Sequence, residues 1–591
     1  MARKASKKDL EELRKTWEST WEDALGSWSR FTKLARPRWC NTRSDEVKEG
    51  LTGSFAMIRL ADHAVVISLK QVHELGLAAF GREILAHEIG HHVFTPGDLR
   101  DNARLIARIR SGLPTREKYA GIVANLYTDL LINDRLQRSA GLNMTGVYEK
   151  LGGPTDKVWT LYMRIYEILW RLAPGTLIPP VNDPTLNVDA DLGARVIRAY
   201  AKDWLGGAGR FAALLLAYLL KVAQPGTLML RLPPWFDAGS AGAGDELPDG
   251  LVAIEEEELD GAIHPSEDES LTGITEDEDG PKKTSPRAGG RATRGGKKNR
   301  HRSPSEYKDL VEGIGVRVDE KEIVIRYYRE RALPYLVEFP TREVREAMDP
   351  LPEGLDTWDV GSPMRQIDWT ESVVRSPHVI PGVTTVKREY GYSQGSSPEK
   401  VPLDLYVGID CSGSMSNPSF DLSYPVLAGA VIAMSALRTG ARVMACLSGE
   451  MPGEYSNTDG FVRSEKAILG ILTGYHGTGY AFGLERLRDA FLKGEKPMRP
   501  THILILSDYD IFHMLEQVRD GWGLIRDAVR KAGGGGTFAL EIDPSHQKEE
   551  IDRMRGCGWD VYPVSSREEL VSFARSFSRA KYGQKPGEDR R

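Results

Sequence analysis

The sequence predicts a multidomain protein with a mainly α-helical N-terminal domain that contains a small β-hairpin, a disordered charged linker, and an α/β doubly wound C-terminal domain. Three observations support this prediction. Most of residues 8–224 show apolar side chains at helical spacing. Gly239–Gly280 carries fifteen acidic residues and no Lys or Arg, whereas Pro281–Arg302 carries nine Lys or Arg and no acid. Residues 401–580 alternate apolar strand patterns with helical ones.

The size and composition fit a soluble protein of several domains. The chain has 591 residues, of which 41% are hydrophobic and 27% charged. We expect domains at 1–236, 306–400 and 401–580, a linker at 237–305 and a flexible tail at 581–591. The net charge of −6 gives no global signal for nucleic acid or membranes. The four cysteines are too scattered for a disulfide framework, and no apolar run is long enough to span a membrane, so a cytoplasmic location is expected (Cys40, Cys411, Cys446, Cys557).

The first element is a predicted helix over residues 8–35. Its large apolar residues recur every three or four positions and are expected to pack in the core (Leu10, Leu13, Trp17, Trp21, Leu25, Trp28). Two apolar, β-branched runs follow at Ser54–Leu60 and Ala64–Leu69, separated by a short polar turn. They predict a β-hairpin. An exposed edge strand here could pair with an extended peptide, although an ordinary sheet element fits the pattern equally well.

The next stretch, Ile84–Thr95, contains the H-E-x-x-H pattern at His87-Glu88-Ile89-Gly90-His91. Residues four apart share one face of a helix, so His87 and His91 can direct two imidazoles at one metal ion. Glu88 then lies beside a water molecule that the ion activates. This is the arrangement of a zinc hydrolase, and we expect the helix to end at Thr95 because Pro96 follows it.

A zinc hydrolase needs a third protein ligand. The predicted helix Thr115–Ser139 sets Asn125, Asp129 and Asn133 on one face at successive four-residue spacings. We expect Asp129 to be the third ligand, with Asn125 and Asn133 orienting it. A hydrogen-bonded polar stripe without metal is the alternative.

The remaining N-terminal residues, 155–224, read as three packing helices. The basic half of the linker could bind nucleic acid or an acidic partner, or fold back onto the acidic half; it lacks aromatic residues for base stacking, so nucleic acid is unlikely. No phosphate-binding Gly-x-x-x-x-Gly-Lys-Ser/Thr motif occurs, so the chain has no evident ATPase of its own. In the module at 306–400 we predict one strand, Glu322–Tyr328.

A second group of polar residues begins where an apolar strand pattern ends at Asp410. The sequence Asp410-Cys411-Ser412-Gly413-Ser414 places a carboxylate and two hydroxyls at the carboxyl end of that strand, where open parallel sheets bind ligands. Oxygen ligands of this kind suit magnesium. We interpret the four glycines of Gly533–Gly536 as a flexible turn from a helix to a strand.

These motifs carry two family resemblances. HEIGHH with the later Asn125-x-x-x-Asp129-x-x-x-Asn133 helix resembles the zincin-like metallopeptidase domains that bacteria fuse to von Willebrand factor A domains. Residues 401–580 resemble the von Willebrand factor A fold with its metal-ion-dependent adhesion site. By that likeness Ser412, Ser414 and Thr478 would bind magnesium directly, and Asp410 and Asp508 mainly through water.

The resemblances also imply partners. An adhesion-site metal takes an Asp or Glu from a partner protein, and bacterial proteins of this kind commonly work with a MoxR-type AAA+ ATPase. We therefore expect a zinc metallopeptidase with a magnesium-dependent docking domain. The alternative is a non-enzymatic adaptor resembling a cobaltochelatase subunit, with a structural or degenerate zinc site.

Overall fold

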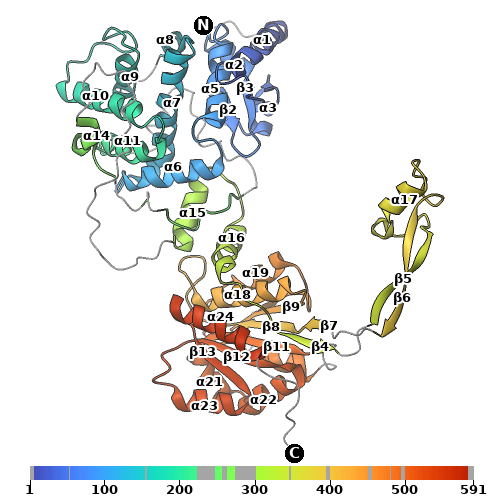
Figure 1. Ribbon diagram of the computed structural model, residues 1–591. Coiled ribbons are helices and arrows are strands. Elements are labelled where there is room, and N and C mark those ends of the chain that lie inside the picture. Colours follow the sequence, from blue (N-terminus) through green and yellow to red (C-terminus); the bar gives the residue numbers. More distant parts are fainter. Residues whose placement is uncertain are drawn as a thin grey trace, which may run out of the picture. The chain divides into compact units, whose positions relative to one another are not determined.

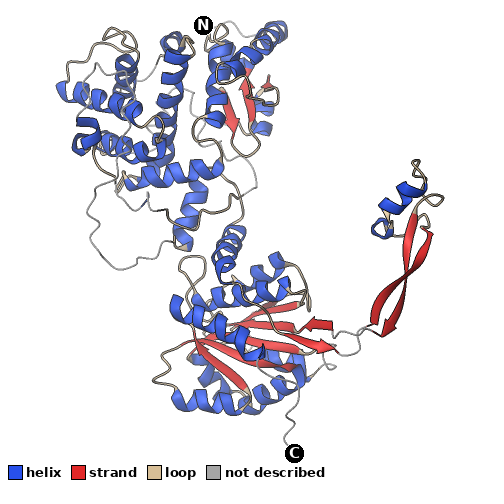
Figure 2. Cartoon of the chain, in the orientation of Figure 1, coloured by secondary structure: helices blue, strands red, loops and turns tan. Residues whose placement is uncertain are grey.

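The computed structural model describes residues 6–51, 54–152, 156–221, 247–255, 258, 262–272, 301–344, 348–394, 399–449, 455–479, 481–493 and 499–582. The chain divides into two compact units. The first is Met1–Arg331 with Ser419–Leu422, and the second is Ala332–Pro418 with Ser423–Arg591. Helices dominate the first unit, and a mixed sheet lies at the centre of the second (Figures 1 and 2).

The first unit is built mainly from helices whose apolar faces pack together. Its helices are α1 (Lys7–Ser19), α2 (Trp21–Gly26), α3 (Arg43–Glu49), α4 (Leu69–Glu74), α5 (Gly81–Val93), α6 (Leu99–Ser111), α7 (Ala120–Ser139), α8 (Met144–Leu151), α9 (Lys157–Leu169), α10 (Pro184–Ala199), α11 (Trp204–Leu219), α14 (Glu269–Thr272), α15 (Pro304–Gly313) and α16 (Glu320–Ala332). The predicted packing helices of residues 155–224 correspond to α9, α10 and α11.

The predicted hairpin is confirmed, and it belongs to a three-stranded sheet. Strands β2 (Ala56–Arg59) and β3 (Ala64–Ser68) are antiparallel. A short strand that the sequence did not reveal, β1 (Arg38–Cys40), runs parallel to β3, so the order is β1-β3-β2. Strand β2 is therefore an edge of this sheet, and α5 packs against it.

The single helix predicted for residues 8–35 is wrong in its extent, because the structure forms two helices. Helix α1 ends at Ser19 and α2 begins at Trp21, with the Thr20 hydroxyl donating to the Trp17 carbonyl at 2.9 Å. Helix α2 ends at Gly26. Four residues of the predicted packing stripe are buried in the core, and the other two are half-buried (buried: Leu13, Trp17, Trp21, Leu25; half-buried: Leu10, Trp28).

Parts of the predicted disordered linker are folded onto the first unit. Asp268 accepts a hydrogen bond from the Tyr200 hydroxyl at 2.6 Å and is ion-paired with Arg210. Glu255 is ion-paired with Arg104, and the Arg302 backbone N–H donates to the Val252 carbonyl at 2.9 Å. Carboxylates of the acidic half thus pair with arginines of the helices. The rest of that linker, including the basic residues 281–300, and tail residues 583–591 lie outside the described residues.

The strand predicted at Glu322–Tyr328 is wrong, because these residues belong to α16. Ile323, Val324, Tyr327 and Tyr328 are all buried, and their spacing of one and four residues matches a helical stripe. A short apolar run rich in β-branched residues does not distinguish a strand from a buried helix.

The second unit is an α/β structure around a six-stranded sheet. Its strands and helices are β8 (Asp404–Ile409), α18 (Tyr424–Arg438), β9 (Val443–Ser448), β10 (Tyr455–Asn457), α19 (Glu465–Leu472), α20 (Glu485–Leu487), β11 (Thr501–Asp508), α21 (Asp510–Gln517), α22 (Gly521–Ala532), β12 (Gly533–Glu541), α23 (Lys548–Gly556), β13 (Trp559–Pro563) and α24 (Arg567–Tyr582). The residues before the sheet form β4 (Thr341–Val344), β5 (Met348–Thr357), α17 (Trp369–Arg375), β6 (Val386–Gln394) and β7 (Glu399–Pro402).

The strand order of the sheet, β10-β9-β8-β11-β12-β13, reverses its direction of progress between β8 and β11. All neighbouring pairs are parallel except β10 with β9. Helices α18, α19 and α24 cover one face, and α21, α22 and α23 cover the other (Figure 1). In such sheets the crevice at the reversal point, at the carboxyl ends of the strands, is the usual ligand site.

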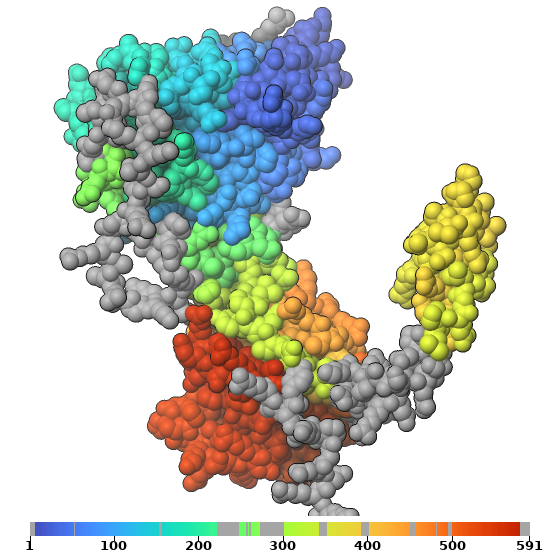
Figure 3. Space-filling model, viewed as in Figure 1, coloured from blue at the N-terminus to red at the C-terminus, as the bar shows by residue number. Residues whose placement is uncertain are grey.

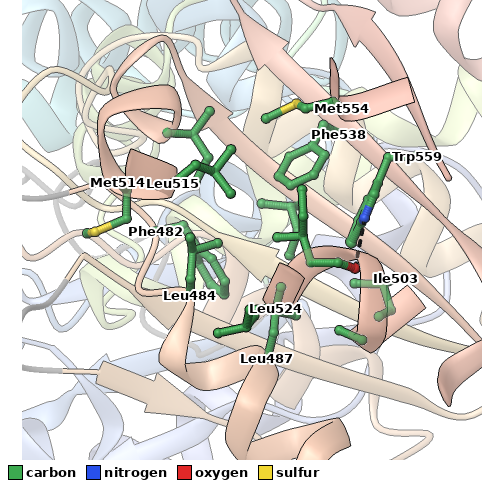
Figure 4. Packing of buried hydrophobic residues seen from close by; sticks show 14 of the residues in the cluster. Phe482, Leu484, Leu487, Ile503, Met514, Leu515, Leu524, Phe538, Met554 and Trp559 are labelled. Atoms are coloured by element: carbon green, nitrogen blue, oxygen red, sulfur yellow. Dashed lines mark hydrogen bonds between the residues drawn. The ribbon is translucent and has the colours of Figure 1, made fainter. Parts of the chain in front are cut away.

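One face of the sheet is closed by a large apolar cluster. Phe482, Leu515, Phe538 and Trp559 lie within it, and the Trp559 indole N–H donates to the Ile525 carbonyl at 3.0 Å (Figure 4). This packing covers the face of β11 and β12 that meets α21 and α22.

The predicted turn from helix to strand at Gly533–Gly536 is confirmed only at its first residue, because Gly533 caps the end of α22 with a positive φ of 71° and β12 also begins at Gly533. A Cβ on Gly534 would lie 2.4 Å from the carbonyl carbon of Thr501, and a Cβ on Gly536 would lie 2.6 Å from the Trp559 ring. Glycine is therefore required here by close approach of neighbouring strands.

Candidate metal centre

Helix α5 presents the H-E-x-x-H residues inside the first unit. Its residues from Ile84 to His91 are all buried. His87 and His91 lie on the side of α5 that meets α7, the helix carrying Asp129. The four-residue spacing within α5 and the packing of α5 against α7 therefore bring three metal-binding side chains together.

The three candidate ligand atoms form a nearly regular triangle. His87 Nε2 and His91 Nε2 are 3.3 Å apart, and Asp129 Oδ1 lies 3.6 Å from His87 Nε2 and 3.4 Å from His91 Nε2. Zinc bonds of about 2.0–2.2 Å in a tetrahedron place ligand atoms about 3.3–3.6 Å apart. The triangle thus has the size that tetrahedral zinc requires.

The surroundings of these atoms also suit a cation. Asp129 Oδ1 is buried and accepts no hydrogen bond from the described residues, which is costly for a carboxylate without a metal. Among the His, Cys, Asp and Glu side chains of the described residues, His87, His91 and Asp129 form the group of three whose ligand atoms lie close enough to hold one ion. The residues present therefore fit a zinc ion.

Burial sets the protonation of the ligands. Removal from water lowers the pKa of His87 to about 4, which keeps its imidazole neutral and able to donate a lone pair. The same loss of solvent raises the pKa of Asp129 to about 7. The neutral imidazole is the form in which a histidine binds zinc.

Both predicted asparagines contact the ligands. Asn125 Nδ2 donates to Asp129 Oδ2 at 3.2 Å, which leaves Oδ1 facing the histidines. Asn133 Oδ1 lies 2.7 Å from His87 Nδ1. An amide oxygen accepts only from a protonated Nδ1, so this contact leaves Nε2 of His87 free of a proton and directed at the triangle.

Three tyrosines behind Asn133 were not anticipated from the sequence. Asn133 Nδ2 donates to the hydroxyls of Tyr148 and Tyr166 at 3.0 and 2.8 Å, and Tyr162 bonds to both of these hydroxyls at 3.3 and 2.9 Å. All three tyrosines are buried. They hold the amide with its oxygen toward His87. In the sequence, the one sign of this cluster is the four-residue spacing of Tyr162 and Tyr166, and such a spacing usually indicates ordinary packing.

Glu88 lies next to His87 on α5 and is fully buried. A general base for hydrolysis must lie within hydrogen-bond reach of the attacking water. Its place in the motif, one residue after the first ligand, is the place that the general base takes in zinc hydrolases with the H-E-x-x-H pattern.

The predicted magnesium residues gather at the second unit's crevice. Asp410 follows β8 and Asp508 ends β11, the two strands that flank the reversal point. Ser412 Oγ lies 3.0 Å from Ser414 Oγ. Ser412 and Thr478 form a β-bridge, and the Gly413 N–H donates to the Thr478 carbonyl at 2.7 Å.

Hydrogen bonds fix the Asp410 carboxylate. It accepts from the Ser412 N–H at 2.8 Å and from the Ser507 hydroxyl. Burial, reinforced by the nearby Asp508 charge, raises the pKa of Asp410 to about 6 despite these bonds. The sequence did not identify two further residues of this site, Ser507 and Asp510, because it pointed only to Asp508 at the end of the strand. The Asp510 carboxylate lies 3.5 Å from Ser414 Oγ.

No family model, curated protein or solved structure matches the chain in comparisons with known proteins. A search of the described helices finds none with the length and apolarity that a membrane span requires.

Proposed function

We propose that this chain is a zinc-dependent peptidase with a zincin-like domain, in which His87, His91 and Asp129 hold the ion. The observation that carries this proposal is the triangle of ligand atoms, with sides of 3.3 to 3.6 Å, formed beside Glu88 of the same motif. Three protein ligands leave the fourth tetrahedral position for water or substrate, as catalytic zinc sites require.

Zinc, when bound, lowers the pKa of a water molecule and polarises a peptide carbonyl. Glu88 takes the proton from the attacking water and delivers it to the leaving amine. Asn133 holds the proton on Nδ1 of His87, and Asn125 fixes the Asp129 carboxylate, so the ligands keep their geometry during the reaction.

The sheet beside α5 suggests how a peptide is presented. Strand β2 is an edge of its sheet and packs against α5. An extended substrate that pairs with β2 would run alongside the helix that carries His87 and Glu88. This favours unfolded segments as substrates.

The test compares cleavage of a fluorescently labelled unfolded protein by the wild-type chain and by Glu88→Gln. We expect zinc content to be equal and the rate to fall by about 10²–10⁴-fold, the usual contribution of a general base. Glu83→Gln, the same change on the same helix, should retain activity. A zinc-loaded wild type that cleaves nothing, or an active Glu88→Gln variant, would overturn the proposal.

One observation favours the alternative of a non-enzymatic adaptor with a structural zinc site. His87, Glu88, His91 and Asp129 are each at most 5% exposed, which is typical of structural rather than open metal sites. In that case both the wild type and Glu88→Gln would bind zinc, and neither would cleave the labelled protein.

We further propose that residues 401–580 form a von Willebrand factor A domain that docks a partner through magnesium. Ser412, Ser414 and Thr478 would supply hydroxyl ligands, and Asp410 and Asp508 would act mainly through water. The order of the sheet and the position of these residues at its reversal point support this. A partner carboxylate would complete the site, and a MoxR-type AAA+ ATPase in a bacterial cytoplasm is the expected partner.

Magnesium titration of the full chain tests the docking site. Asp410→Asn keeps one acceptor oxygen for the Ser412 N–H, and its amide N–H can donate to the Ser507 hydroxyl, but the charge is removed, so magnesium affinity should fall at least about 10-fold. Asp560→Asn, on the exposed side of β13, is the matched control and should bind as the wild type does. Equal affinities in the wild type and Asp410→Asn would exclude magnesium at this position.

A further inference from the structure

Residues 348–394 form an arm that is distinct from both metal centres. Strands β5 and β6 are antiparallel from Met348 opposite Gln394 to Thr357 opposite Val386. Among the strands that the structure describes, they pair only with each other (Figure 2). The tip of the arm, residues 358–385, contains α17. Figure 3 draws the arm in yellow.

The tip has a defined conformation held by its own hydrogen bonds. The Trp358 N–H donates to the Thr385 carbonyl and the Asp368 N–H to the Val386 carbonyl, both at 2.8 Å. The Val386 N–H donates to the Ser372 hydroxyl at 3.0 Å. The side chains of the tip are therefore presented on a fixed framework.

Helix α17 is oriented with its polar side inward. Ser372 is fully buried, whereas Trp369, Val373 and Val374 are 50%, 51% and 74% exposed. Trp369 and Val373 lie four residues apart on one face. A surface helix normally turns its apolar face toward the core. Because α17 instead exposes its apolar side chains to solvent, this face is expected to bind another molecule.

The tip exposes further apolar side chains before and after α17 in the sequence. They bring the exposed set to Val360, Met364, Trp369, Val373, Val374, Ile380 and Val383, which we call the tip surface. At roughly 100 Å² for each fully exposed large side chain, these seven partly exposed residues offer about 440 Å², which can form the apolar centre of an interface to which one partner contributes ~800 Å² in a standard case.

The charged side chains of the tip favour a second copy of the chain over an anionic membrane surface as the partner. Residues 358–385 carry three acids, Asp359, Asp368 and Glu371, and two bases, Arg365 and Arg375. Near balance allows two copies to meet without strong repulsion. Acidic side chains among the apolar ones are unfavourable for insertion into an anionic membrane surface.

We propose that the tip surface is a self-association site whose occupant is the tip surface of a second copy of this chain. A twofold arrangement of this kind buries the same side chains on both copies, and the assembly is complete as a dimer. The proposal is independent of the zinc and magnesium centres.

The test is sedimentation of the full chain over a concentration series, without and with Trp369→Ser or Val374→Asp. We expect a wild-type dimer and a dissociation constant at least about 30-fold larger in each variant, because a central Trp or a buried charge costs about 2 kcal/mol or more at an interface. Val188→Asp, at a 61% exposed position on α10, should leave the dimer unchanged.

Circular dichroism of each variant checks that the chain remains folded. A wild type that stays monomeric at high micromolar concentration would overturn the proposal, and so would a dimer that both folded tip variants retain. Co-flotation of the wild type, but not of the variants, with anionic vesicles in the absence of a dimer would overturn it in favour of a lipid surface.

Discussion

Replacing Asp129 with alanine is expected to release zinc from the purified chain. Asp129 Oδ1 is one of the three triangle atoms, and the two histidines alone cannot form the three-ligand site. We expect about one zinc ion per wild-type chain and an affinity lower by more than ~100-fold in Asp129→Ala, because loss of a direct ligand exceeds the cost of losing an outer partner. Metal analysis after dialysis, followed by competition with a chromophoric chelator, measures both quantities.

The matched control lies on the same helix. Asp134 is also buried, but it is ion-paired with Arg138 at 2.6 Å and takes no part in the triangle. Asp134→Ala should therefore keep its zinc, and His91→Ala should lose it as Asp129→Ala does. If Asp129→Ala retained zinc while His91→Ala lost it, the third ligand would be a different residue.

The metal-binding residues could be predicted because each depends on a local spacing. His87 and His91 share a helical face by their own separation, and Asp129 stands out as a carboxylate on an apolar helix. The contact between α5 and α7 is a tertiary contact, which helical spacing does not predict. For this reason a polar stripe without metal remained an alternative from the sequence alone. The triangle distances now favour the metal.

The hydrogen-bond network behind the ligands could not be predicted in the same way. Tyr148 belongs to α8, and Tyr162 and Tyr166 belong to α9. Their hydroxyls meet only because these helices pack around Asn133 on α7. Spacing within one helix carries no information about partners on another, and tyrosines at a four-residue interval usually indicate packing.

The errors in fold have a related cause. The Glu322–Tyr328 run has strand-like composition, but packing of Tyr327 and Tyr328 selected a helix. The glycines at 533–536 have turn-like composition, but contact with Thr501 and Trp559 placed them in β12. The sequence predicts no strand or helix within the arm, because its apolar residues lack a regular period and remain exposed.

Replacing Gly90 with alanine is expected to destabilise the first unit, although alanine favours helix formation by about 1 kcal/mol. A Cβ at Gly90 would lie 2.6 Å from Cζ2 of Trp28 and 2.7 Å from Cγ2 of Ile132, and Ile132 belongs to α7. Helices α5 and α7 must then separate, which costs about 1–3 kcal/mol in a packed core. The same movement enlarges the triangle between His87, His91 and Asp129, so zinc affinity should fall together with stability.

Urea titration monitored by zinc release measures this effect in the first unit, and Gly121→Ala provides the control. Gly121 lies on α7, and the atom nearest to its added Cβ is 3.8 Å away, an ordinary contact distance. Helix propensity should therefore dominate there, and Gly121→Ala should move the midpoint to higher urea. The two glycine-to-alanine changes thus have opposite expected signs. A Gly90→Ala variant that also gained stability and kept its zinc would show that α5 and α7 do not need this close contact to form the metal centre.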